Sequence, residues 1–288
     1  MMGNNDQQAY DRGTSLFSPD GRIYQVEYAR EAVSRGAPSV GIRTAEGVAF
    51  VAMSRATSTL MESESIEKLH KLDDHVGTAS AGHVADARQL IDLARRQSQG
   101  NRLRYGEPVG VEALTKFVTD HIQENTQRGG TRPYGAALLI GGVEDGEPRL
   151  FAADPSGTPN EWKATVIGGG RQEIQAHLEE EWTDDLSLPD GIELGVAALA
   201  VHDDELEPDD VAVATITEAD GYRTVPTDEV AAAFEAAGIG DGADDSDETD
   251  AEDADGAGEA ADADGADEAD DDDAEADAGD DADADDEE

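Results

Sequence analysis

Hydrophobic residues recur along this chain at two spacings, one typical of helices and one typical of strands. In the first helical segment, Ile23, Val26 and Val33 share one apolar stripe. Ser18 or Asp20 provides a start signal just before it. The same kind of spacing predicts helices over residues 20–34, 83–99, 111–127, 170–182, 190–203 and 227–237.

Short runs of small, β-branched and apolar residues lie between these helices and end at turn-forming residues. They predict strands over residues 39–44, 48–53, 68–72, 76–81, 135–143, 149–154, 161–167, 211–217 and 222–225. Strands follow strands and helices follow helices, which favours an α+β fold over alternating βαβ units. The expected architecture is a four-layer αββα sandwich, in which helices cover the outer faces of two antiparallel sheets.

The C-terminal end is the most acidic part of the chain. Of the 68 aspartates and glutamates, 27 lie within residues 241–288, which contain no Lys, Arg, Leu, Ile, Val, Phe, Tyr or Trp. Such a segment cannot bury enough apolar surface to offset its ordering entropy, so we expect a disordered tail. A cation-binding or basic-partner role is the bolder interpretation of this tail, and a solubilising role is the simpler one.

The rest of the chain is acidic as well. The formal net charge is −48, and residues 1–240 hold 41 acids against 20 bases, of which four are lysines. At ordinary ionic strength this self-repulsion would destabilise a compact state, whereas multi-molar salt shortens the Debye length to about 3 Å or less. We therefore infer a salt-in cytoplasm, as in haloarchaea. The alternative is an ordinary acidic protein with a charged tail.

Several classes of function find no support in the residues. The chain has no cysteine, and its six histidines lack the spacing of a metal site. Residues 168–171, Gly-Gly-Gly-Arg, lack a phosphate-loop lysine and fit a tight turn better. The absence of clustered positive charge argues against nucleic-acid binding. No segment fits a signal peptide or a membrane helix, so we expect no membrane partner and a cytoplasmic location.

The N-terminal segment carries the most informative motif. Tyr10-Asp11-Arg12 is followed by Phe17-Ser18-Pro19-Asp20-Gly21-Arg22 and then by the first predicted helix. This segment resembles the N-terminal signature of archaeal proteasome α subunits, and the resemblance extends over about residues 9–238. Further motifs of the family follow in the family's order: Ser65-Ile66-Glu67-Lys68, Gly82 with Val84-Ala85-Asp86-Ala87-Arg88, Arg132-Pro133-Tyr134-Gly135, Pro148-Arg149-Leu150-Phe151 and Lys163-Ala164-Thr165.

The resemblance implies the sandwich fold of N-terminal-nucleophile hydrolases. It also implies a heptameric ring of α subunits that caps rings of β subunits. Residues 1–13 would be a mobile gate segment that blocks or clears the pore for unfolded protein substrates, residues 14–240 the α-type domain, and residues 241–288 the tail. The residues that match the family's gate cluster are Tyr10, Asp11, Pro19 and Tyr28.

Pockets between neighbouring subunits of this family receive the C-terminal tails of regulatory AAA ATPases. The matching positions are Gly21, Arg22, Glu27, Arg30, Lys68, Gly82 and His83. Lys68 would pair with the incoming terminal carboxylate. His83 stands where family members often have an apolar residue. Taken without the resemblance, the charged residues of this set would equally fit a solvated face with weak ion pairs.

The β subunits of the family carry the nucleophile, a free N-terminal threonine whose own amine activates its hydroxyl. Here Ala37 falls about where that nucleophile should be, and Met53 lies near the position of an acid in the β subunits. We therefore expect a non-catalytic subunit with no catalytic residue, metal or cofactor. The alternative is a self-processing hydrolase that is active alone and exposes Ser39.

Overall fold

The computed structural model of the chain describes residues 17–18, 21–56, 58, 60–128 and 131–239. The chain divides into two compact units, Met1–Asp245 and Ser246–Glu288, and every described residue belongs to the first. The predicted gate segment 1–13 and the predicted tail 241–288 lie outside the described residues, so both stay predictions.

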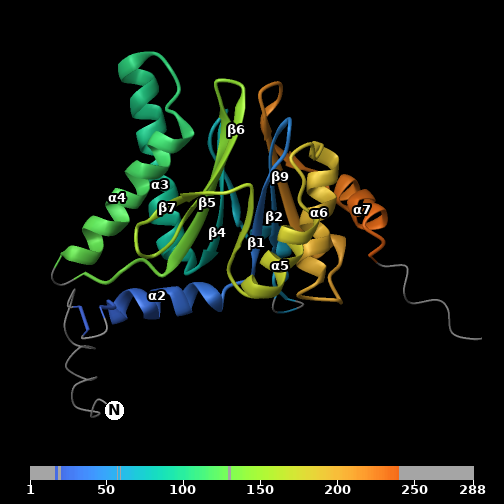
Figure 1. Ribbon diagram of the computed structural model, residues 1–288, viewed down its shortest axis with the longest axis horizontal. Coiled ribbons are helices and arrows are strands. Elements are labelled where there is room, and N and C mark those ends of the chain that lie inside the picture. Colours follow the sequence, from blue (N-terminus) through green and yellow to red (C-terminus); the bar gives the residue numbers. More distant parts are fainter. Residues whose placement is uncertain (1–16, 19–20, 57, 59, 129–130, 240–288) are drawn as a thin grey trace, which may run out of the picture. The chain divides into compact units, whose positions relative to one another are not determined.

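Two five-stranded antiparallel sheets form the centre of the first unit (Figure 1). One sheet has the strand order β10-β9-β2-β1-β8, and the other has the order β3-β4-β5-β6-β7. The first contains β1 (Ser39–Arg43), β2 (Gly47–Met53), β8 (Ala164–Ile167), β9 (Val211–Thr217) and β10 (Gly221–Val225). The second contains β3 (Leu69–Asp73), β4 (Val76–Gly82), β5 (Ala136–Glu144), β6 (Glu147–Ala153) and β7 (Pro159–Glu161).

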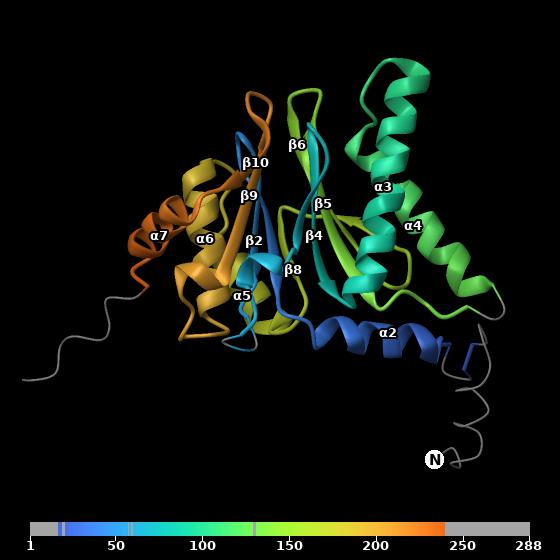
Figure 2. The same cartoon turned by 180° about the vertical axis from the view of Figure 1, so that it is seen from behind.

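Helices cover both outer faces of this pair of sheets (Figures 1 and 2). The second sheet is covered by α3 (Val84–Tyr105) and α4 (Val111–Gln127). The first sheet is covered by α5 (Arg171–Glu181), α6 (Leu188–Ala200) and α7 (Thr227–Ala236). This arrangement is the αββα sandwich that the sequence predicts. Among the described helices, none combines the length and the apolar composition that crossing a membrane requires.

The helix α2 (Tyr24–Ser34) lies across one end of the sandwich and contacts β4 and β5 (Figures 1 and 2). Val26, Ala29 and Val33 form its buried face, whereas Arg30 is exposed. Single 3₁₀ turns occur at Ser63–Ser65 and Pro208–Asp210.

The core lies in three apolar layers, one between the sheets and one under each helical layer. Every residue of β2 is buried, because one face of this strand meets the other sheet and its opposite face meets α6. Gly41 and Gly141 let the sheets approach closely. A Cβ atom at Gly41 would lie 2.9 Å from Leu150 Cδ1, and one at Gly141 would lie 2.8 Å from Val48 Cγ1.

The predicted single strand over residues 161–167 is wrong, because the chain changes sheets inside it. At Trp162 the backbone N–H still donates to Leu150 of β6, over 2.9 Å. One residue later, the carbonyl of Lys163 accepts from Arg43 of β1, over 2.8 Å. The segment therefore splits into β7 in one sheet and β8 in the other. A continuous run of strand-forming residues cannot reveal such a crossing.

Two helix ends also differ from the expectation. Ser18 does not cap α2: its hydroxyl accepts from the backbone N–H of Arg22 over 3.1 Å and closes a turn before the helix. Asp20 lies outside the described residues. The helix α3 passes Gly100 and ends only at Gly106, whose φ of 77° gives the left-handed conformation common at helix ends.

Candidate functional site

Four of the predicted docking residues meet at the N-terminal end of α2. Gly21, Arg22, Glu27 and Arg30 all line one cavity of about 920 Å³, whose opposite wall is the C-terminal part of α4. Gly21 has a φ of 74°, so the turn before the helix uses the conformation that glycine adopts most easily. The exposed guanidinium of Arg22 faces no ion-pair partner among the residues that the structure describes.

Arg30 is held by two carboxylates rather than standing free. Its Nε and Nη2 donate to Asp154 Oδ2 over 3.0 and 2.8 Å, and its Nη1 donates to Glu27 Oε1 over 2.8 Å. Partial burial lowers the pKa of Arg30, but the bonds and charges of Asp154 and Glu27 outweigh burial and raise that pKa overall. Asp154 follows β6 and was not among the residues that the sequence predicted.

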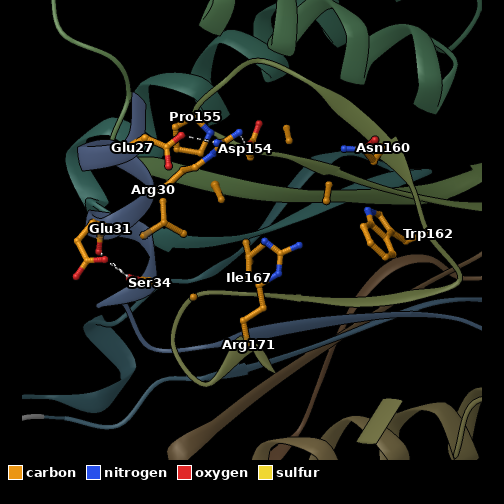
Figure 3. Close-up of a pocket in the computed structure, with 15 residues that line it drawn as sticks. Glu27, Arg30, Glu31, Ser34, Asp154, Pro155, Asn160, Trp162, Ile167 and Arg171 are labelled. Atoms are coloured by element: carbon orange, nitrogen blue, oxygen red, sulfur yellow. Dashed lines mark hydrogen bonds and ion pairs between the residues drawn. The ribbon is translucent and has the colours of Figure 1, made fainter. Parts of the chain in front are cut away.

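A second cavity, of about 380 Å³, is lined by Arg30 and Asp154 as well (Figure 3). Val33, Ala137 and Ile167 are apolar members of its lining. Figure 3 shows Arg30 and Asp154 at one side of this cavity and Trp162 at another. Glu27 and Arg30 line both cavities, so the two cavities share these side chains.

Lys68 lies just before β3 and points to the chain segment that precedes β1. Its Nζ donates to the carbonyl oxygens of Ala37 and Pro38 over 2.6 and 2.9 Å. Although the residue as a whole is only partly buried, desolvation of its ammonium group lowers the pKa of Lys68 to about 7.

Gly82 and His83 join β4 to α3 near the C-terminal end of α2. Gly82 has a φ of 97°, and a Cβ atom there would lie 2.4 Å from the carbonyl oxygen of Gly135. His83 is exposed and occupies the N-cap of α3, and its backbone N–H donates to Gly135 over 2.8 Å. Asp86 and Arg132, which form an ion pair, fix this junction further.

The seven predicted docking residues do not form one site within a single chain. Gly82 touches Val33 at the C-terminal end of α2, because a Cβ atom at Gly82 would lie 3.2 Å from Val33 Cα. Gly21 and Arg22 precede the N-terminal end of the same helix, whose 11 residues span about 16 Å. The residues therefore form two groups: Gly21, Arg22, Glu27 and Arg30 in one, and Lys68, Gly82 and His83 in the other.

Of the predicted gate residues, only Tyr28 is described by the structure. It is 47% exposed on α2, and its ring stacks on that of Tyr24 with centroids 6.5 Å apart. Tyr10, Asp11 and Pro19 lie outside the described residues, so the gate cluster stays a prediction.

The residues at the expected nucleophile position offer no accessible hydroxyl. Ala37 has a methyl side chain there. The hydroxyl of Ser39 is fully buried and donates to the carbonyl of Ser80 over 3.0 Å. Within the described residues, no cluster of three or more His, Cys, Asp or Glu side chains could hold a metal ion.

Two family profiles match the chain. The profile described as "Proteasome subunit" matches residues 33–216. The profile for the N-terminal signature of A-type proteasome subunits matches residues 10–32, which include the N-terminal motif and most of α2.

Proteins similar over most of the chain come from haloarchaea, as the charge balance predicts. "Proteasome subunit alpha 2" of Haloferax volcanii is 62% identical over 245 residues, covering 85% of this chain and 98% of that protein. "Proteasome subunit alpha 1" of the same organism is 62% identical over 238 residues, covering 82% and 94%. "Proteasome subunit alpha" of Halobacterium salinarum is 61% identical over 231 residues, covering 80% and 91%.

Proposed function

We propose a gating and docking role for this chain, which belongs to the proteasome α-subunit family and is therefore a non-catalytic subunit of the α ring. In this role it assembles with other α subunits into a heptameric ring and stacks on β subunits that carry the threonine nucleophile. Regulatory AAA ATPases dock on the ring, and unfolded proteins pass through it. The particle works in the cytoplasm.

The observation that carries the proposal is the separation of the two groups of docking residues. Arg22 and Glu27 lie at one end of α2, and Lys68 and Gly82 lie at the other end. In a ring of identical chains, the first group of one chain can face the second group of its neighbour. A cation, a glycine backbone and a cavity then meet at the junction, which suits the carboxylate end of an ATPase tail.

Lys68 suits this task because its ammonium is held in place before a ligand arrives. Two carbonyl oxygens orient its Nζ, and only desolvation opposes its charge. An incoming carboxylate would offset that desolvation cost by direct pairing. High salt screens the charge attraction at long range, so the hydrogen bonds contribute more of the docking energy.

The gate is tested by deleting residues 2–11 and measuring hydrolysis of a short fluorogenic peptide by the particle assembled with its β subunits. Removing a segment that blocks the pore should raise the rate several-fold. An unchanged rate in a particle of full mass would contradict the gate.

Docking is tested by Lys68→Ala in the same particle, with a purified haloarchaeal regulatory AAA ATPase and ATP. Loss of the ammonium should abolish stimulation by the ATPase while the mass of the particle stays that of the wild type. Stimulation equal to that of the wild type would contradict the docking role of Lys68.

A further inference from the structure

Arg30 is a docking residue by resemblance, yet its hydrogen-bonding capacity is largely used within the chain. Three of its donor atoms, Nε, Nη1 and Nη2, bond to carboxylate oxygens of Asp154 and Glu27 at distances of 3.0 Å or less. Two negative charges within bonding distance offset its single positive charge. Arg30 is therefore poorly suited to attract a further carboxylate from an incoming ligand.

The geometry instead gives Arg30 a place in the wall of the docking cavity. Glu27 and Arg30 line the cavity of about 920 Å³ at the N-terminal end of α2 and also the cavity of about 380 Å³ beside it. Asp154 lines the smaller cavity and Ser156 lines the larger one. The hydrogen bonds from Arg30 to Asp154 hold the guanidinium in this shared lining.

Asp154 is fixed before it meets Arg30. Its Oδ1 accepts from the hydroxyl of Ser156 over 2.5 Å and from the backbone N–H of Ser156 over 3.2 Å, which leaves Oδ2 for Arg30. The turn closes at Gly157, whose N–H donates to the carbonyl of Asp154 over 3.0 Å. A Cβ atom at Gly157 would lie 2.7 Å from Thr119 O, so this turn sits tightly against α4.

We infer that Asp154 is a positioning residue that holds Arg30 as a rigid wall of the docking cavity. This inference rests on the proposed docking function. It divides the roles of the predicted residues: Arg22, which has no ion-pair partner among the described residues, is assigned to the ligand, and Arg30 shapes the space that the ligand enters. The link between α2 and the turn after β6 joins residues 124 positions apart.

The test uses Asp154→Asn, Arg30→Gln and the double variant in the full particle, with a purified haloarchaeal regulatory AAA ATPase and ATP as the probe. The ATPase concentration that gives half-maximal stimulation should rise about three- to tenfold in each single variant, since a partly exposed ion pair contributes modestly. The double variant should be no worse than Arg30→Gln alone, because Arg30→Gln already removes the link that Asp154→Asn breaks. The maximal stimulated rate should stay close to that of the wild type, which a general loss of structure would not allow.

Asp184→Asn is the matched control. It removes the carboxylate of another ion pair, Lys163–Asp184 at 2.9 Å, whose two residues line neither cavity. The ATPase concentration that gives half-maximal stimulation of this variant should equal that of the wild type. Wild-type values for both Asp154→Asn and Arg30→Gln, or additive effects in the double variant, would overturn the inference. If the ATPase fails to stimulate even the wild-type particle, the proposed docking function fails and the inference falls with it.

Discussion

The guanidinium of Arg132 donates two hydrogen bonds to the carboxylate of Asp86, from Nη1 to Oδ2 over 2.5 Å and from Nη2 to Oδ1 over 2.7 Å. The same carboxylate accepts from the backbone N–H of Gly135 over 2.8 Å. Asp86 is only 3% exposed. Two sequence motifs separated by 46 residues thus meet at one carboxylate, and the strand start at Gly135 is held against Gly82 and His83.

Asp86→Asn should therefore destabilise the chain by about 1–3 kcal/mol. The asparagine side chain would place an NH2 donor where the carboxylate accepts a hydrogen bond, and the negative charge that pairs with Arg132 would be lost. Guanidinium unfolding in high salt measures the loss. Glu124→Gln is the control, since Glu124 pairs with Arg128 at 3.5 Å on the exposed surface and should change stability by less than about 0.5 kcal/mol. Equal losses of stability in the two variants would contradict a special stabilising role of the Asp86–Arg132 pair.

The stabilising contribution of the Asp86–Arg132 pair should depend on pH. Burial raises the pKa of Asp86, but the hydrogen bonds from Arg132 and Gly135 outweigh burial and lower that pKa overall. The contribution of Asp86 to stability is complete above its unfolded pKa of about 3.9 and disappears as the pH falls through the lower folded pKa. The stability difference between the wild type and Asp86→Asn should shrink as the pH is lowered below about 4. A difference that stays constant down to strong acid would contradict this assignment.

Lys68 should give a pH dependence of the same sign, but in the alkaline range. Burial lowers its folded pKa to about 7, whereas the unfolded value is near 10.5. Between these two values the unfolded chain binds the proton and the folded chain does not, so stability rises with pH. Relative to Lys68→Met, the wild-type chain before assembly should gain stability from pH 7 to pH 10. Parallel pH profiles of the two chains would show that Lys68 keeps its ordinary pKa.

Docking should follow the charge of Lys68 as well. A bound carboxylate favours the ammonium form, so stimulation by the ATPase should weaken as the pH rises above 7. Lys68→Arg keeps its charge at every such pH and should show a flatter profile. Identical profiles would exclude Lys68 as the group that titrates.

Gly82 and Gly100 offer a matched pair of glycine substitutions. Gly82→Ala should cost at least about 2 kcal/mol, because φ is 97° and the new Cβ atom would lie 2.4 Å from Gly135 O. Gly100 lies inside α3 with no atom within 4 Å of its added Cβ, so Gly100→Ala should gain about 0.5–1 kcal/mol. Thermal unfolding measures the stability of the two variants. If Gly100→Ala lost as much stability as Gly82→Ala, the close approach of Gly82 to Gly135 would not explain the loss at Gly82.

Local patterning in the sequence was enough to predict the layers of the fold. The apolar stripe at Val26 and Val33 marked the buried face of α2, and the predicted strands over residues 39–44 and 48–53 marked the paired strands β1 and β2. The change of sheet at Trp162 escaped prediction because it depends on which neighbouring strand accepts each hydrogen bond. The residue types in 161–167 do not indicate which neighbouring strand pairs with each residue.

The positioning residues escaped prediction for a similar reason. Asp154 and Asp86 each bond an arginine far away in the sequence, and the chain is so rich in acids that no single carboxylate stands out. The resemblance supplied Arg30 as a docking position, but only the structure shows that its charge is already neutralised by Asp154 and Glu27. The sequence Asp154-Pro155-Ser156-Gly157 predicts a turn, but it does not indicate that Asp154 bonds Arg30 of α2.

Under the proposed docking function, the placement of the predicted docking residues at opposite ends of α2 makes every junction between subunits a joint product of two chains. A chain altered at Arg22 still brings an intact Lys68 to one neighbour, and a chain altered at Lys68 still brings an intact Arg22 to the other. A ring co-assembled from the two altered chains would contain some junctions with both halves intact and others with both halves altered. Two variants that are each inactive alone could therefore restore part of each other's function when they are mixed, much as complementing alleles do.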